Sequence, residues 1–384
     1  MSRLSDDAEK HMREFSVLDP SLFPEPLGAE LFSEPEEFMR GRASSAYTTY
    51  SNVRTDQQYG RLLLYINNDP RVNAHAFLGG SDSLITINGG TCVRLRQLFQ
   101  FVVLDRDTFP EEPGEVVILD AEAAKFGVDS HSLLEPADLA PRAGQPSVDD
   151  YIHLFAPLPN TLRRRELAEA LYYAALDYLV MHEVAHIARQ HADYFDRGRA
   201  IHFSETQEDK CCSPSEQPSL IHKIEADADL TACILSAPSL CVGSAAMEFW
   251  RGWAKDSAQA LGFWLFAVGM TLSLFDGWSN GPDRRARYPH PAVRLALILM
   301  QAAWTVSNES DIDQSRMVEI LREAHFRALM AWARLGLPSD IAMDRGRPFL
   351  DWESWSPQAT ELYNEVRDTM YPADELRPGD PQPS

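Results

Sequence analysis

The pattern of hydrophobic and polar positions changes several times along the 384 residues of the chain. Residues 1–58 are polar, acidic and interrupted by proline, which predicts an N-terminal extension that lies against a domain rather than forming one. From residue 61 onward, short apolar runs alternate with Gly, Asn and Asp, and this pattern predicts a small β-sheet. The β-type runs are RLLLYINND (61–69), NAHAFLGGSDSLITINGG (73–90), LFQFVVLD (98–105) and EVVILD (115–120).

Helical spacing of apolar residues dominates the second half of the chain. Residues 106–160 are rich in Pro, Asp and Glu and are predicted to form an insertion. The predicted domain covers residues 59–335, and residues 336–384 are predicted to form a C-terminal extension that ends in a loose tail. The order of elements predicts an α+β fold in which a small sheet packs on a mainly helical body. The predicted helices are 161–191, 218–236, 245–275, 291–307 and 312–335.

Charge and cysteine content limit the class of partner and the compartment. With 35 Lys and Arg against 57 Asp and Glu, the formal net charge is −22. Such a surface repels phosphate backbones and anionic lipid, so we expect no nucleic-acid partner. The five cysteines are odd in number, two of them (Cys211 and Cys212) are adjacent, and the N-terminal stretch has no apolar core of a signal peptide. We therefore expect reduced thiols and a cytoplasmic protein.

One apolar segment raises the question of a membrane. Residues 257–275 form a run of 19 residues without a charged side chain, close to the roughly 20 residues that a membrane-spanning helix needs. Ser, Gln and Thr dilute the run, and Asp256 and Asp276 flank it without a basic residue. We predict a buried core helix, with a membrane-embedded helix as the alternative.

The segment VMHEVAHIARQH (180–191) carries the strongest chemical signal. His182 and His186 are four residues apart, so on a helix they lie one turn apart on the same face. This spacing lets two imidazole nitrogens bind one tetrahedral Zn²⁺ at about 2.0–2.1 Å. Glu183 stands beside them, where its carboxylate can take a proton from water on the metal. His191 does not fit the third-histidine position of metzincins, and we predict an ordinary residue at the helix end.

A third ligand is predicted in the segment HKIEADADLTACIL (222–235). Glu225 and Asp229 are again four residues apart on a predicted helix, so both can face the metal. Glu225 is the predicted ligand, and Asp229 is predicted to accept the second N–H of a ligand histidine. Asp227 points about 200° away from Glu225 on a helix and is predicted to be solvated.

The histidine and carboxylate segments, in this order, resemble the gluzincin clan of zinc metallopeptidases. The stretch at 73–90 is similar to the Asn-Ala-x-Ala-x-x-Gly-Gly strand of CAAX-prenyl-peptidase-like enzymes. The stretch YPHPAVRLAL (288–297) is similar to the His-Pro-x-x-x-Arg element of those enzymes, and such a His-Pro also occurs in Lit-like phage-exclusion peptidases. Together the four elements cover about residues 73–300. The resemblance implies a zincin-type domain that carries the HExxH helix.

The resemblance also implies roles for residues around the metal. His290 would stabilise the oxyanion of the tetrahedral intermediate, with Tyr288 as another donor of the same kind. His290 has an alternative role as a capping residue before Pro291. Arg294 either pairs near Asp229 and Glu225 or lies on the helix surface.

The strand near residues 83–88 has two interpretations. It is either a sheet edge that binds an extended substrate through its backbone, or a half-buried strand without such a role. The predicted substrate-binding residues are Ser83, Leu84, Ile85, Thr86 and Ile87.

From these features we expect a zinc-dependent endopeptidase that acts on a polypeptide substrate. His182, His186 and Glu225 would hold Zn²⁺, Glu183 would deprotonate the attacking water and then deliver the proton to the leaving amine. The alternatives are a zinc-stabilised protein-interaction module without significant hydrolysis and a membrane-associated peptidase. Long insertions often act as lids, so a regulatory partner or effector of a latent activity is also compatible with the sequence.

Overall fold

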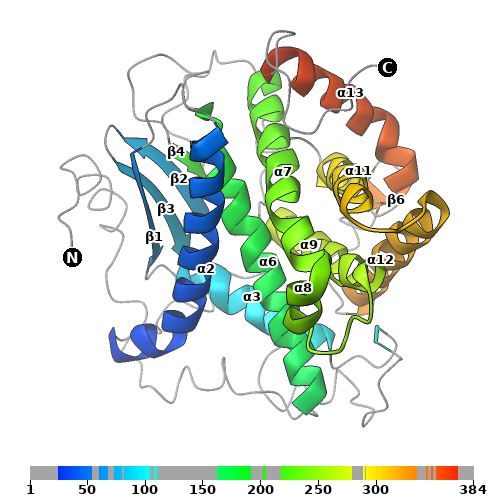
Figure 1. Ribbon diagram of the computed structural model, residues 1–384, viewed down its shortest axis with the longest axis horizontal. Helices are drawn as coiled ribbons and strands as arrows, with labels where there is room; N and C mark the ends of the chain where they lie inside the picture. Colours follow the sequence, from blue (N-terminus) through cyan, green and yellow to red (C-terminus); the bar gives the residue numbers. More distant parts are fainter. Residues whose placement is uncertain are drawn as a thin grey trace.

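A four-stranded sheet lies on one side of a mainly helical body, as the α+β prediction requires (Figure 1). The computed structural model describes residues 25–53, 60–67, 73–79, 82–103, 108–109, 162–191, 202–204, 218–278, 289, 291–334, 343–344, 347–348 and 352–370. The predicted strand at 115–120 and almost all of the predicted insertion at 106–160 lie outside them.

The sheet has the strand order β1-β3-β2-β4. β1 (Arg61–Asn67) pairs in parallel with β3 (Asp82–Asn88), and β2 (Ala74–Gly79) pairs antiparallel with both β3 and β4 (His202–Ser204). β3 is therefore an interior strand, and its residues are almost all buried. Leu84, Ile85 and Ile87 supply its apolar side chains, while Asp82, Ser83 and Asn88 are polar residues that are also buried.

The predicted strand at residues 98–105 is wrong. Residues 98–102 belong instead to helix α3 (Gly89–Val102), and Val103 is the residue at its C-terminal end. Twelve of the fourteen residues of α3 are buried, and Leu98, Phe99, Phe101 and Val102 are among them. A short apolar run of this kind has no period that separates a buried helix from a buried strand.

Helix α6 (Leu162–Ala188) runs through the centre of the molecule and confirms the helix predicted at 161–191. It contacts α2, α3, α7 and α9 as well as strand β2. Every side chain from Ala174 to Ala188 is buried, including the polar ones. A helix that is buried on all sides has no face directed toward solvent. Its small alanines let the neighbouring helices approach closely. The HExxH segment therefore lies on a stretch of helix that the fold encloses completely.

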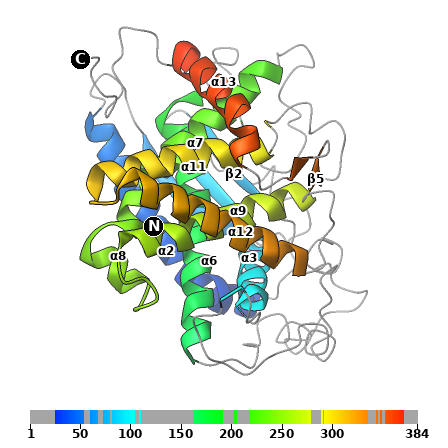
Figure 2. The same ribbon diagram turned by 90° about the vertical axis from the view of Figure 1, so that its right-hand side faces the viewer.

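The remaining helices complete the body, and those predicted at 218–236, 291–307 and 312–335 are confirmed. Figure 2 looks onto α11 and α12, with α13 above them, and α13 packs on α11 and α7. The single helix predicted at 245–275 is wrong, because the chain turns between two helices where Arg251 and Gly252 have φ values of 48° and 80°. The helices are α7 (Pro218–Cys241), α8 (Gly243–Phe249), α9 (Ser257–Trp278), α11 (Pro291–Glu309), α12 (Gln314–Arg334) and α13 (Trp352–Met370).

The segment Ser257–Phe275 within α9 is long and apolar enough to cross a membrane, judged by length and composition alone. In the structure, 83% of this apolar window is buried inside the protein. α9 packs against α6, α7, α11 and α12. The prediction of a buried core helix agrees with this packing.

A helix that the sequence analysis did not predict, α2 (Glu25–Val53), lies in the N-terminal extension. It packs against α6 and β1, and the side chains of Phe32, Met39, Ala43 and Tyr47 are buried in the common core. Their spacing of seven, four and four residues places them on one face of a helix. Pro35 lies inside this helix, and the prolines of the segment obscured the helical pattern.

Truncation of the α2 core should destabilise the whole domain. Met39 is fully buried, so Met39→Ala should lower the free energy of unfolding by about 2–5 kcal/mol. The measurement is the midpoint of urea denaturation followed by circular dichroism. The control Glu37→Ala changes an exposed residue of the same helix and should leave the midpoint unchanged. Equal midpoints for both variants would show that α2 does not contribute to the core.

Candidate metal centre

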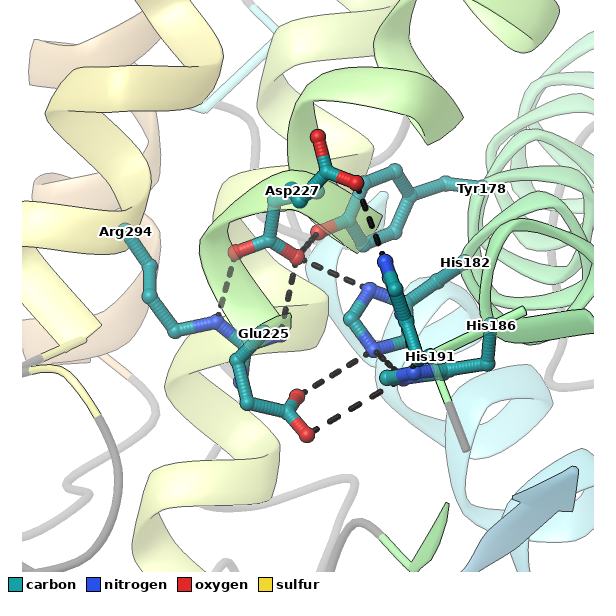
Figure 3. A network of polar contacts seen from close by, with 8 residues as sticks. Tyr178, His182, His186, His191, Glu225, Asp227 and Arg294 are labelled. Atoms are coloured by element: carbon teal, nitrogen blue, oxygen red, sulfur yellow. Dashed lines mark hydrogen bonds and ion pairs between the residues drawn. The ribbon is translucent and has the colours of Figure 1, made fainter. Parts of the chain in front are cut away.

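Two helices that lie against each other, α6 and α7, carry the candidate site (Figure 3). α6 presents His182 and His186 one turn apart, and α7 presents Glu225 toward them. The Nε2 atoms of the two histidines are 3.1 Å apart. Glu225 Oε2 lies 3.4 Å from His182 Nε2, and Glu225 Oε1 lies 3.9 Å from His186 Nε2. These three buried side chains, which the sequence predicted as ligands, could hold one metal ion.

The spacing of the three ligand atoms fits a tetrahedral ion. Ligand distances of about 2.0–2.1 Å imply about 3.3–3.4 Å between any two ligand atoms of a tetrahedral site. The two Nε2 atoms are 3.1 Å apart, and they lie 3.4 and 3.9 Å from the two different carboxylate oxygens of Glu225, on either side of that value. Two imidazoles and one carboxylate are also a ligand set that zinc takes in catalytic sites, where a fourth position stays open.

His182 is oriented by a buried aspartate on α7. Asp229 Oδ1 lies 2.9 Å from His182 Nδ1, which is the contact expected from the sequence. If Asp229 accepts the Nδ1 proton, the Nε2 atom of His182 is left with its lone pair toward Glu225.

Asp229 is held in its charged form by three donors besides His182. Tyr178 OH donates to Asp229 Oδ1 at 2.7 Å, and Arg294 donates to both carboxylate oxygens at 2.7 and 2.8 Å. Burial alone would raise the pKa of Asp229, but the charge and hydrogen bonds of Arg294 outweigh it and hold the pKa below its usual value. Of the two alternatives for Arg294, the structure therefore shows the ion pair with Asp229 rather than a place on the helix surface.

His191 is not an ordinary helix-end residue, and that prediction is wrong. Its side chain is fully buried, and its Nδ1 atom lies 2.9 Å from His186 Nδ1. Its Nε2 atom lies 2.9 Å from Asp227 Oδ2. The prediction that Asp227 is solvated is also wrong, because Asp227 is fully buried and accepts a hydrogen bond of 2.9 Å from Arg189 Nε. Through these contacts His191 holds the Nδ1 side of the His186 ring, as Asp229 holds the Nδ1 side of the His182 ring.

The chain from Asp227 through His191 to His186 fixes the tautomers of both rings. A carboxylate can only accept, so His191 donates from Nε2 to Asp227. Burial lowers the pKa of His191 despite the opposing effect of Asp227, so its ring is neutral and its Nδ1 accepts a proton from His186 Nδ1. Burial and the neighbouring His182 also lower the pKa of His186, which is therefore neutral as well. The Nε2 lone pair of His186 then faces His182 and Glu225.

The other predicted site residues divide into three groups. Glu183 follows His182 on α6, and its side chain is 1% exposed. His290 and Tyr288 lie outside the described residues. Ser83, Leu84, Ile85, Thr86 and Ile87 lie in β3.

The prediction that residues 83–87 form a substrate-binding sheet edge is wrong. β1 and β2 occupy the two sides of β3, so its backbone is paired along its whole length. The edges of the described sheet are β1 and the short β4. The pattern of residue types could not reveal this, because it contains no information on the order of strands.

Comparisons with protein-family models, with curated protein sequences and with solved structures find no match for this chain.

Metal content is the first test of the site. We expect about one zinc ion per chain in protein purified without chelator, measured by inductively coupled plasma mass spectrometry. His182→Ala and His186→Ala each remove one of three ligands and should lose the metal. The control His325→Ala removes a histidine on α12, outside the cluster, and should keep it. Wild-type protein without metal would refute the site.

The role of His191 can be tested through metal affinity. His191→Ala leaves His186 without its Nδ1 partner, and loss of such a contact typically weakens metal binding by about 10–100-fold. Competition with a chelator of known affinity gives the dissociation constant. His191→Gln retains a carbonyl acceptor and an amide donor and should recover part of the loss. If the Ala variant binds zinc as tightly as the wild type, His191 only fills space.

Proposed function

We propose that this protein is a zinc-dependent endopeptidase with the metal held by His182, His186 and Glu225. The observation that carries the proposal is the convergence of two imidazole Nε2 atoms, 3.1 Å apart, with the carboxylate of Glu225, whose oxygens lie 3.4 and 3.9 Å from them. A purely structural zinc site favours four protein ligands, whereas a catalytic site has three and an open position. The group found among the described residues has three members.

The side chains of the site supply the other parts of a hydrolytic mechanism. Zinc at this position would supply Lewis acidity, which lowers the pKa of a water molecule and polarises a carbonyl group. Glu183 is the proposed general base: its carboxylate accepts a proton from the attacking water and then donates it to the leaving amine. Asp229 and His191 hold the two ligand imidazoles in the tautomer that leaves Nε2 free of a proton.

The motif resemblance to gluzincins supports the same proposal and adds two residues to it. By that resemblance, His290 or Tyr288 donates a hydrogen bond to the developing oxyanion. Arg294, the arginine of the His-Pro-x-x-x-Arg element, binds Asp229. Arg294 is thus linked to the metal cluster, since Asp229 itself contacts His182. The proposed substrate is a polypeptide.

Replacement of Glu183 separates an enzyme from a zinc-stabilised interaction module. Glu183→Gln removes the base but keeps the volume of the side chain and all three metal ligands. We expect zinc content and thermal stability close to those of the wild type, and a loss of peptide hydrolysis of at least about 100-fold. Hydrolysis is measured on a peptide library by mass spectrometry.

The matched control is Glu169→Gln, which makes the same chemical change at an exposed position of the same helix. It should hydrolyse the library at the wild-type rate. Wild-type activity in Glu183→Gln would refute the assignment of the base. A zinc-loaded wild-type protein that cleaves no peptide in the library would favour the interaction module.

A further inference from the structure

One oxygen of the Asp229 carboxylate is shared by three side chains. Its Oδ1 atom accepts a hydrogen bond from the hydroxyl of Tyr178 at 2.7 Å and another from Nη2 of Arg294 at 2.8 Å. Nδ1 of His182 lies 2.9 Å from the same oxygen. The other oxygen, Oδ2, accepts a hydrogen bond from Nε of Arg294 at 2.7 Å. A carboxylate oxygen has about two lone pairs, so the hydroxyl, the guanidinium and the imidazole compete for Oδ1.

The hydroxyl of Tyr178 is held in this position by the packing of its ring. Tyr178 precedes His182 by four residues on α6, so both rings lie on one face of the helix, with their centroids 6.4 Å apart. The ring of Trp264, on α9, packs edge-on against that of Tyr178 with 6.2 Å between the centroids. The tyrosine side chain is buried, and its hydroxyl donates to Asp229. Tyr178, His182 and Arg294 point toward one another in Figure 3.

Tyr178 and Arg294 act on the carboxylate in different ways. Arg294 brings a positive charge that offsets the cost of burying Asp229, and it donates to both oxygens. Tyr178 is neutral, so the charge balance of the interface does not require it. Its hydrogen bond of 2.7 Å is nevertheless as short as charge-assisted O–H···O⁻ bonds are, and such a donor draws electron density from Oδ1. The same oxygen is then a weaker acceptor for the Nδ1 proton of His182.

The strength of the contact between Asp229 and His182 controls how the imidazole binds a metal ion. A carboxylate that accepts the second N–H of a ligand histidine raises the basicity of the ring, and the ring then donates more electron density through Nε2. More donation gives tighter metal binding but a less electrophilic ion. A donor that competes for Oδ1 therefore shifts the balance from affinity toward electrophilicity.

We propose that Tyr178 is a positioning residue that acts through Asp229: its hydroxyl limits the hydrogen bond from His182 and keeps the metal more weakly bound and more electrophilic. Asp229 selects the tautomer of the imidazole, and Tyr178 sets how strongly Asp229 accepts the Nδ1 proton. The statement on electrophilicity rests on the proposed peptidase function, whereas the statement on metal affinity does not.

Replacement of Tyr178 by phenylalanine tests this competition. Tyr178→Phe removes the hydroxyl and keeps the ring, so the aspartate oxygen serves only His182 and Arg294. We expect the dissociation constant for zinc, measured by competition with a chelator, to fall about threefold or more. The matched control is Tyr172→Phe, which removes another buried tyrosine hydroxyl from α6, one that bonds to Cys92. It should lower thermal stability to a similar extent but leave zinc affinity unchanged.

A second variant at the same position should shift the affinity in the opposite direction. Site-specific replacement of Tyr178 by a ring-fluorinated tyrosine keeps the shape of the side chain, and the electron-withdrawing fluorine makes the hydroxyl a stronger donor. The zinc dissociation constant should then rise about threefold. Variants with opposite effects at one position exclude misfolding as the cause. With a peptide substrate, kcat of Tyr178→Phe should fall about threefold or more with KM unchanged, because the ion polarises the carbonyl group less.

The proposal is overturned if Tyr178→Phe binds zinc as tightly as Tyr172→Phe or more weakly, because the hydroxyl then only supports the helix interface. It is also overturned if the fluorinated variant binds zinc no more weakly than the wild type. These affinities are measured without substrate. A wild-type protein that binds zinc but cleaves no peptide would therefore refute the proposed function and leave this test intact.

Discussion

Neutralisation of the buried carboxylates of α7 is the constraint on which the rest of the centre depends. A carboxylate without partners costs several kcal/mol inside a protein, so α7 can pack against α6 only where donors meet Asp227 and Asp229. Arg189 supplies charge to Asp227, and Arg294 supplies it to Asp229. Each aspartate then has a further oxygen lone pair for a histidine ring. The two arginine–aspartate pairs therefore offset the cost of burying the carboxylates between α6 and α7, and the same aspartates orient the histidine rings.

This double use of charge explains the position of α11. Arg294 enters the interface from the first turns of that helix and donates two hydrogen bonds to Asp229. α11 is thus tied to the metal centre through α7, although it contributes no proposed ligand among its described side chains. Burial of a charged network of this kind is costly if one member is lost, because the others are then left unpaired.

The ligands could be predicted from the sequence because an α-helix translates a spacing of four residues into one face. His182, His186 and Glu225 follow that rule. His191 does not, since on a continuous helix it would point about 140° away from His186. The helix ends at Ala188, and Gln190 adopts a φ of 50°. This turn brings the Nδ1 atom of His191 to the Nδ1 atom of His186. Strand order and the helix at 89–102 likewise depend on packing partners distant in sequence, which local patterns do not contain.

The attachment of α2 has a consequence for the time course of folding. Arg42 donates to Asp177, 135 positions further along the chain, and also to Ser239, 197 positions away. Contacts at such separations form only after large loops have closed, and a high contact order slows folding. During synthesis, α2 leaves the ribosome long before either partner exists, with the apolar face of Phe32 and Met39 uncovered. The first of the described helices to be synthesised is therefore one of the last to find its place, and the nascent chain depends on it remaining soluble until then.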